Sequence, residues 1–173
     1  MIPARWPLWI QLLLALASGS VAVIGFAPFS IGLVPVLSVA LLIGLWRCAQ
    51  TPRQGGLLGY AFGLGRMGFG VSWIRISIAQ FGGVHEALAI SITVLFVVLM
   101  AIYYALAGWL AVRLAGNRGT LWLLMIVPGI WVSMEWLRGW LFTGFPWLAL
   151  GYSQIDLPLL GLAPLLGVYG VTL

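Results

Sequence analysis

Long apolar runs alternate along the chain with short segments that contain arginine, proline or glycine. A run of about 20 mostly apolar residues is long enough to cross a bilayer as a helix. The pattern predicts five complete spans, at about residues 7–26, 31–46, 55–78, 87–112 and 121–141. A sixth run begins after Asp156 and reaches the last residue. We therefore expect an all-α fold, a polytopic transmembrane helix bundle, in a chain that continues past residue 173.

The first run allows two interpretations. Arg5 precedes it and the small residues 18–20 lie within it, as in a signal peptide. However, residues 7–26 exceed the usual apolar core of a signal peptide, about 7 to 15 residues, and further apolar runs follow in place of a soluble protein. We interpret residues 7–26 as a retained first span.

Composition supports a membrane protein and leaves no room for a soluble domain. Hydrophobic residues make up 63% of the chain and charged residues 6%, whereas an average soluble domain has roughly 25% charged residues. Residues 1–173 are thus predicted to be one transmembrane domain. Cys48 and His85 are the only residues of their types and have no partner at metal-ligand spacing, so we expect no metal, cofactor or internal disulfide.

The basic residues predict an orientation. All eight are arginine, the net charge is +5, and they are dispersed, which indicates loop orientation and not a nucleic-acid surface. Five alternating spans with a cytoplasmic N-terminus place one group of arginines on the inner side: Arg5, Arg47, Arg53, Arg113 and Arg118. The loops at 27–30, 80–86 and 139–158 then face outwards.

Two arginines and a set of glycines lie within or near the third predicted span. An arginine at the bilayer centre costs about 2.5 to 3.5 kcal/mol on insertion scales. We expect Arg75 to reach the interface from the end of the span, and Arg66 to need an internal partner that the sequence does not identify. Small residues at four-residue spacing predict close helix packing in lipid, here Gly59, Gly63, Gly65, Gly68 and Gly70.

The stretch 131–156 concentrates the polar and aromatic residues. Glu135 and Arg138 are three residues apart, which predicts that they meet on one helix face. Pro146 lacks a backbone N–H and predicts that the helix ends before it. The amphipathic rings are expected at the membrane boundary, namely Trp131, Trp136, Trp140, Trp147 and Tyr152.

Three blocks of this sequence resemble the bacterial apolipoprotein N-acyltransferases. They are residues 25–29 (GFAPF), residues 68–83, and residues 135–156 together with Pro158 and residues 161–164. Arg75 departs from the pattern, since an aromatic residue is expected there. The resemblance implies an enzyme of the bacterial inner membrane that transfers an acyl chain from a phospholipid to the N-terminal S-diacylglyceryl cysteine of lipoproteins. Its partners would be the phospholipid donor, the diacylglyceryl-modified apolipoproteins and membrane lipid.

The resemblance also implies where catalysis takes place. In that family a cysteine nucleophile, a glutamate base and a lysine belong to a nitrilase-like soluble domain, which we expect beyond residue 173. The chain contains no lysine, so we assign no catalytic residue and expect the fragment alone to be inactive. The residues that match the family motif are substrate- or lipid-binding candidates: Glu135, Arg138, Phe145, Pro146, Trp147, Tyr152 and Gln154.

Alternatives remain open for these residues and for the chain. Glu135 and Arg138 form either a structural ion pair or a contact to a lipid headgroup. Trp147 either anchors the loop at the interface or lines a path for lipid. A membrane transporter or channel is an alternative function, in which Arg66 and Glu135 would mark a solute route. A purely structural membrane scaffold is a further alternative.

Overall fold

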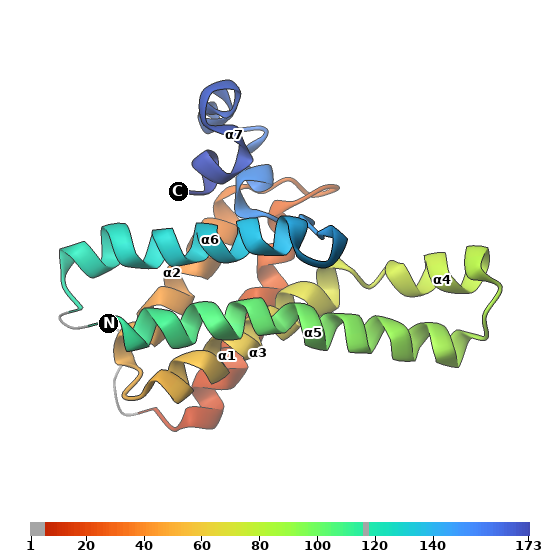
Figure 1. The fold of residues 1–173 in the computed structure, drawn as a ribbon, viewed down its shortest axis with the longest axis horizontal. Coiled ribbons are helices and arrows are strands. Elements are labelled where there is room, and N and C mark those ends of the chain that lie inside the picture. Colours follow the sequence, from red (N-terminus) through yellow and green to blue (C-terminus); the bar gives the residue numbers. More distant parts are fainter. Residues whose placement is uncertain (1–5, 116–117) are drawn as a thin grey trace.

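The computed structural model describes residues 6–115 and 118–173, and throughout these residues the regular structure is helical (Figure 1). The predicted all-α fold is therefore confirmed, with no strand in the described part of the chain. The helices are α1 (Leu8–Val21), α2 (Leu33–Cys48), α3 (Pro52–Gly70), α4 (Ile74–Gly82), α5 (Glu86–Arg113), α6 (Val127–Trp140) and α7 (Ala163–Thr172). A 3₁₀ segment (Ala22–Gly25) extends α1, and a π-helical segment (Trp122–Ile126) precedes α6.

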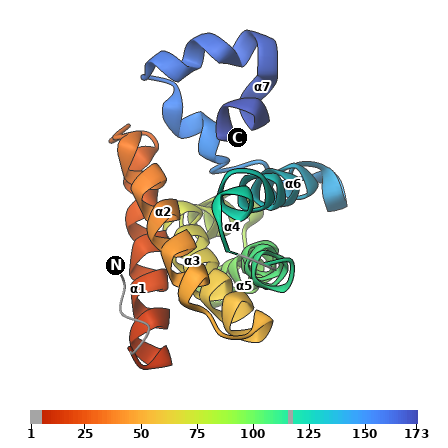
Figure 2. The ribbon, with the colours of Figure 1, turned by 90° about the vertical axis from the view of Figure 1, so that its left-hand side faces the viewer.

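Helix α3 lies between α1 and α5 and packs against both (Figure 2). Glycine permits the close approach: a Cβ on Gly59 would clash with the carbonyl oxygen of Tyr104 in α5, and a Cβ on Gly65 would clash with that of Leu16 in α1. Backbones that come this close are typical of small-residue packing between membrane helices. The packing role predicted for these two glycines is confirmed.

Aromatic rings fill the space between α2, α3, α5 and α6. The ring of Trp131 lies 6.4 Å from that of Trp46, 6.0 Å from Phe62 and 5.7 Å from Tyr104. Trp131 is only 4% exposed, so its predicted place at the membrane boundary is wrong. The ring instead packs in the core, where tilted and edge-on aromatic contacts are favourable. Four other rings of the stretch are about half exposed: Trp136, Trp140, Trp147 and Tyr152.

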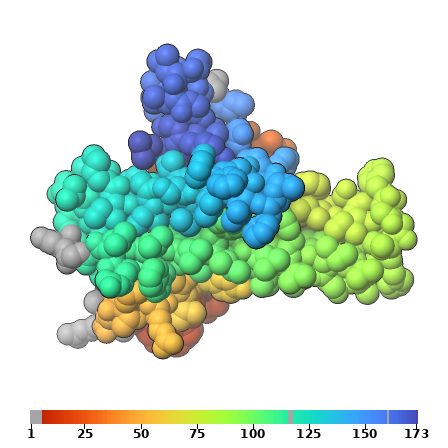
Figure 3. Space-filling model, viewed as in Figure 1, coloured from red at the N-terminus to blue at the C-terminus, as the bar shows by residue number. Residues whose placement is uncertain are grey.

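The third predicted span, residues 55–78, is not one helix. Helix α3 ends at Gly70, residues 71–73 form a turn, and α4 follows with no buried residue. Figure 3 shows α4 and the facing first turns of α5 as an arm that projects from the body. Apolar residues continue on both sides of the break, so the pattern did not predict it. At the turn, the Trp73 ring lies 5.5 Å from that of Trp147.

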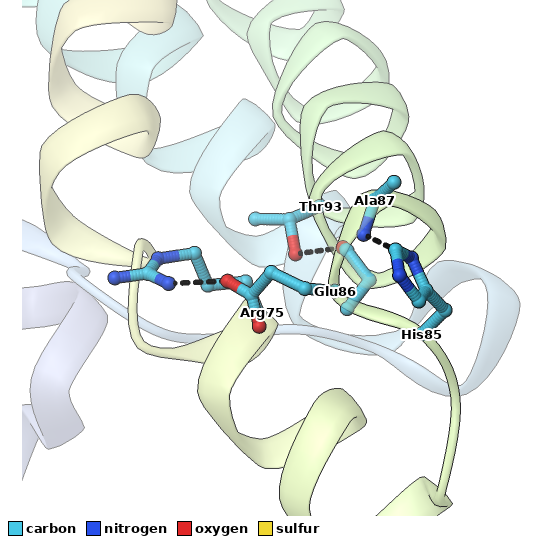
Figure 4. Close-up of polar contacts among 6 residues, drawn as sticks. Arg75, His85, Glu86, Ala87 and Thr93 are labelled. Atoms are coloured by element: carbon cyan, nitrogen blue, oxygen red, sulfur yellow. Dashed lines mark hydrogen bonds and ion pairs between the residues drawn. The ribbon is translucent and has the colours of Figure 1, made fainter.

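Arg75 forms an ion pair across the arm. Its Nη1 lies 2.7 Å from Oε1 of Glu86, at the start of α5 (Figure 4). The two side chains are 46% and 50% exposed. Our expectation that Arg75 simply extends towards the interface therefore missed a partner that lies only 11 residues away.

Two helical segments of the described residues are long and apolar enough to cross a membrane, Leu8–Gly25 and Glu86–Arg113. Arg47 and Arg53 lie in the helix ends that flank the α2–α3 connection, and Arg113 ends α5. That connection and the C-terminal end of α5 lie at the left of Figure 1, whereas the α4–α5 turn lies at the right. Arg118 donates a hydrogen bond to the carbonyl oxygen of Arg47 at 2.6 Å. Two of the loops predicted to share a side thus touch each other.

Candidate functional site

The chain reverses direction after α6 through an irregular segment, residues 141–149, which we call the reversing segment. Phe142, Thr143 and Gly144 have φ angles of 53°, 74° and 80°, and Pro146 follows. The predicted end of the helix before Pro146 is confirmed, since α6 stops at Trp140. Leu148 also has a positive φ, 59°. A non-glycine residue in this region costs on the order of 1 to 3 kcal/mol and persists where the surroundings enforce it.

Glu135 is buried in α6 and is 3% exposed. Its Oε1 accepts hydrogen bonds from the indole N–H of Trp131 at 3.0 Å and from the backbone N–H of Leu150 at 2.9 Å. Its Oε2 accepts from the Thr172 hydroxyl at 3.1 Å. The carboxylate therefore connects α6 to Leu150, directly after the reversing segment, and to the end of α7.

Arg138 is 1% exposed and forms hydrogen bonds to the backbone of the reversing segment. Its Nη1 donates to the carbonyl oxygens of Phe145 at 2.8 Å and Trp147 at 2.6 Å. The predicted direct pair with Glu135 is wrong: within residues 6–115 and 118–173, the one ion pair within 4.0 Å is Arg75–Glu86. The two side chains share a helix face but bind different groups: Arg138 donates to backbone carbonyls of the segment, whereas Glu135 accepts from Trp131, Leu150 and Thr172.

Arg66 reaches this segment from α3 and is completely buried. Its Nη2 donates to the carbonyl oxygen of Leu148 at 2.9 Å. Its guanidinium carbon lies 5.4 Å from the ring centroid of Phe26 and 5.9 Å from that of Phe62, within the range of cation–π attraction.

A cavity of about 540 Å³ lies beside the reversing segment. Pockets for small molecules are usually of about 300 to 1,000 Å³. The three blocks that carry the family resemblance converge on it. Its lining comprises Val23, Gly25, Phe26, Ala27, Ser30, Gly70, Trp73, Pro146, Trp147, Leu148, Tyr152 and Ile155.

The structure divides the seven predicted binding residues into two groups. Pro146, Trp147 and Tyr152 line the cavity. Phe145 does not: its ring packs edge-on against Phe96 of α5, 4.9 Å away. The other three are buried. Glu135 and Arg138 form the hydrogen bonds described above, and Gln154 donates to the Gly32 carbonyl oxygen at 2.9 Å.

Several cavity residues were missed by sequence reasoning, although the signals existed. Phe26 belongs to the first resembling block and Trp73 to the second. Arg66 was recognised as a residue that needs a partner, but its partner Leu148 lies 82 positions along the chain. The side chains that line the cavity carry hydroxyl groups, on Ser30 and Tyr152, but no amine, thiol or carboxylate. This composition suits binding of an apolar molecule with a polar end.

Comparison with known proteins places the chain in a family. Residues 18–173 match the family described as "Apolipoprotein N-acyltransferase N-terminal domain". An apolipoprotein N-acyltransferase of Methylococcus capsulatus is 48% identical over 160 residues, which are 92% of this chain and 32% of that protein. One of Nitrosomonas europaea is 43% identical over 166 residues, 95% of this chain and 33% of the relative. The chain thus spans about a third of the length of these relatives. It belongs to the apolipoprotein N-acyltransferase family and corresponds to the N-terminal domain of its members.

Proposed function

We propose that this chain is the membrane part of an enzyme that transfers an acyl chain from a phospholipid to the N-terminal S-diacylglyceryl cysteine of lipoproteins. The cavity between residues 23–30, the end of α3 and residues 146–155 holds part of the phospholipid donor. The observation that carries this proposal is the convergence of the three family-like blocks on one apolar cavity. The bond-making residues belong to a nitrilase-like domain that follows residue 173.

The cavity's lining matches the two ends of a lipid. Val23, Phe26, Leu148 and Ile155 provide apolar walls for an acyl chain. Trp73, Trp147 and Tyr152 are 45%, 49% and 49% exposed, and such amphipathic rings favour the level of the headgroups. The family match supports this function over the transporter or channel alternative.

We further propose that the protein lies in the bacterial inner membrane with five spans, a cytoplasmic N-terminus and the cavity on the periplasmic side. Supporting this orientation, the α2–α3 connection, flanked by Arg47 and Arg53, lies at the end of α5 that carries Arg113. Arg118 donates a hydrogen bond to the carbonyl oxygen of Arg47 at the same end. Cytoplasmic loops carry an excess of basic residues in membrane proteins generally.

The test replaces Trp147 by alanine in the full-length protein. We expect the KM for phospholipid to rise by about tenfold, because the ring forms part of the cavity wall and burial of an aromatic surface contributes on the order of 1.5 to 3 kcal/mol. Transfer of a labelled acyl chain from phospholipid in mixed micelles to a synthetic diacylglyceryl lipopeptide measures it.

Trp136→Ala is the matched control, since Trp136 is 53% exposed and is not part of the cavity lining. The control should leave the KM for phospholipid unchanged. Equal effects of the two substitutions would show that the cavity has no particular role. A full-length protein that transfers no acyl chain would contradict the enzymatic function itself.

A further inference from the structure

Three buried charged side chains from two helices converge on six residues of backbone. Arg138 donates to the carbonyl oxygens of Phe145 and Trp147, Arg66 donates to that of Leu148, and Glu135 accepts from the N–H of Leu150. We call residues 145–150 the clamped segment. It contributes the side chains of Pro146, Trp147 and Leu148 to the cavity wall.

The clamped segment has a conformation that its own sequence does not favour. Leu148 adopts a φ of 59°, and its carbonyl oxygen accepts from Arg66 at 2.9 Å. Its side chain lies so close to Gly70 that a Cβ there would clash with it. Backbone in this region persists only where the surroundings enforce it. The hydrogen bond from Arg66 and the contact with Gly70 both restrain Leu148 in this conformation.

Arg66 is poorly suited to a merely structural role. It is completely buried, yet its Nε and Nη1 have no hydrogen-bond partner among the described residues. A buried charge stabilises a fold only when its hydrogen bonds are satisfied, and apolar residues of similar volume often serve as well or better. Besides the core ring of Phe62, it contacts Leu148 and the ring of Phe26, which are both part of the cavity wall.

We infer that Arg66 is a positioning residue for the donor site: it fixes Leu148 and Phe26, and through them the shape of the cavity that binds the phospholipid, without being among the residues that line it. This inference rests on the proposed function of the cavity. A residue of α3, outside the stretch 135–156, would then influence the affinity for the lipid through its contacts with Leu148 and Phe26.

The experiment compares the full-length protein with Arg66→Met and Arg66→Lys. In Arg66→Met, amide hydrogen exchange in residues 145–150 should accelerate, while exchange in α5 stays as in the parent. The KM for phospholipid should rise by about tenfold with little change in kcat, since a hydrogen bond from a charged donor is lost. Arg66→Lys retains a charged donor and should recover part of both effects.

Arg75→Met is the matched control, because it removes the same charge from a half-exposed arginine that pairs with Glu86 outside the cavity. It should change neither readout. Unchanged exchange in the clamped segment of Arg66→Met would overturn the positioning role. Faster exchange together with an unchanged KM would also overturn it, provided that Trp147→Ala still raises the KM. If Trp147→Ala leaves the KM unchanged, the donor-site proposal fails, and the exchange data alone decide whether Arg66 holds the segment.

If Arg66→Met does not fold, Phe26→Leu provides the second variant. It removes the aromatic face over which the guanidinium lies and keeps an apolar side chain in the wall. Faster exchange in residues 145–150 would then support the inference, because the backbone hydrogen bonds of Phe26 join it to Val23, Phe29 and Ser30 and not to these residues. Unchanged exchange would contradict it.

Discussion

The Glu135 carboxylate joins three parts of the chain that are distant in sequence. Its acceptor sites are occupied by the indole of Trp131, the backbone of Leu150 and the hydroxyl of Thr172. At the residue scale, therefore, one carboxylate connects α6 to Leu150 and to the end of α7.

We predict that Glu135→Ala lowers the free energy of unfolding by about 2 to 6 kcal/mol. The indole N–H of Trp131 and the backbone N–H of Leu150 then lose their acceptor, and each buried donor left unsatisfied costs about 1 to 3 kcal/mol. Glu135→Gln keeps one oxygen acceptor and should recover part of the loss. Unfolding in detergent measures both variants, with the half-exposed Glu86→Ala as the control. Equal losses for Glu135→Ala and Glu86→Ala would contradict the prediction.

The sequence was sufficient to identify the charged residues of the site but not their partners. Spacing alone put Glu135 and Arg138 on one face, which is correct, and suggested that they bind each other, which is not. Arg138 binds backbone carbonyls of residues 145 and 147, and Glu135 accepts from the backbone of Leu150 and from the side chains of Trp131 and Thr172. The backbone partners become available only because the chain folds back after Trp140. Periodicity along a helix carries no information about such long-range backbone partners.

At the scale of elements, α3 is the helix against which the others are placed. Its glycines permit contact with α1 on one side and α5 on the other. The apolar pattern predicted the existence and approximate bounds of the long helices, most closely for α5, predicted at 87–112 and found at Glu86–Arg113. The break after Gly70 was not predicted, because no proline or charge cluster marks residues 71–73.

We predict that Gly59→Ala destabilises the protein and that Gly129→Ala does not. A Cβ at Gly59 would clash with backbone of α5, whereas nothing lies within 4 Å of the position of a Cβ at Gly129. Overpacking of this kind costs typically about 1 to 3 kcal/mol. Thermal unfolding of the two variants in detergent gives the comparison. Equal midpoints would show that α3 and α5 separate easily enough to admit the methyl group.

At the scale of the whole molecule, the basic helix ends and the arm lie at opposite ends of α5. Arg113 ends α5, and the α2–α3 connection, flanked by Arg47 and Arg53, lies at the same end, whereas the arm with its exposed ion pair projects at the other. The count of five spans stays a prediction, because α3 is rich in glycine, and α6 is short and carries two charges.

We predict that the two ends face opposite sides of the membrane. Single cysteines at Thr143 and at Gln50, both exposed, are introduced into a Cys48→Ser background. In intact spheroplasts a membrane-impermeant maleimide should label the cysteine at 143 and leave the one at 50 unreacted until the cells are disrupted. Labelling of both or of neither before disruption would contradict the alternating topology, and the reverse pattern would invert it.

The length of α5 has a consequence for the lipid around it. Its 28 residues span about 42 Å, whereas the hydrocarbon layer of a typical bilayer is about 30 Å thick. A helix with this excess tilts, thickens the bilayer locally or extends beyond it, at a cost of fractions of a kcal/mol per Å of mismatch. Under the proposed topology, the position of the arm relative to the bilayer then depends on bilayer thickness, so the chain length of the host lipids becomes a physical variable of the proposed donor site.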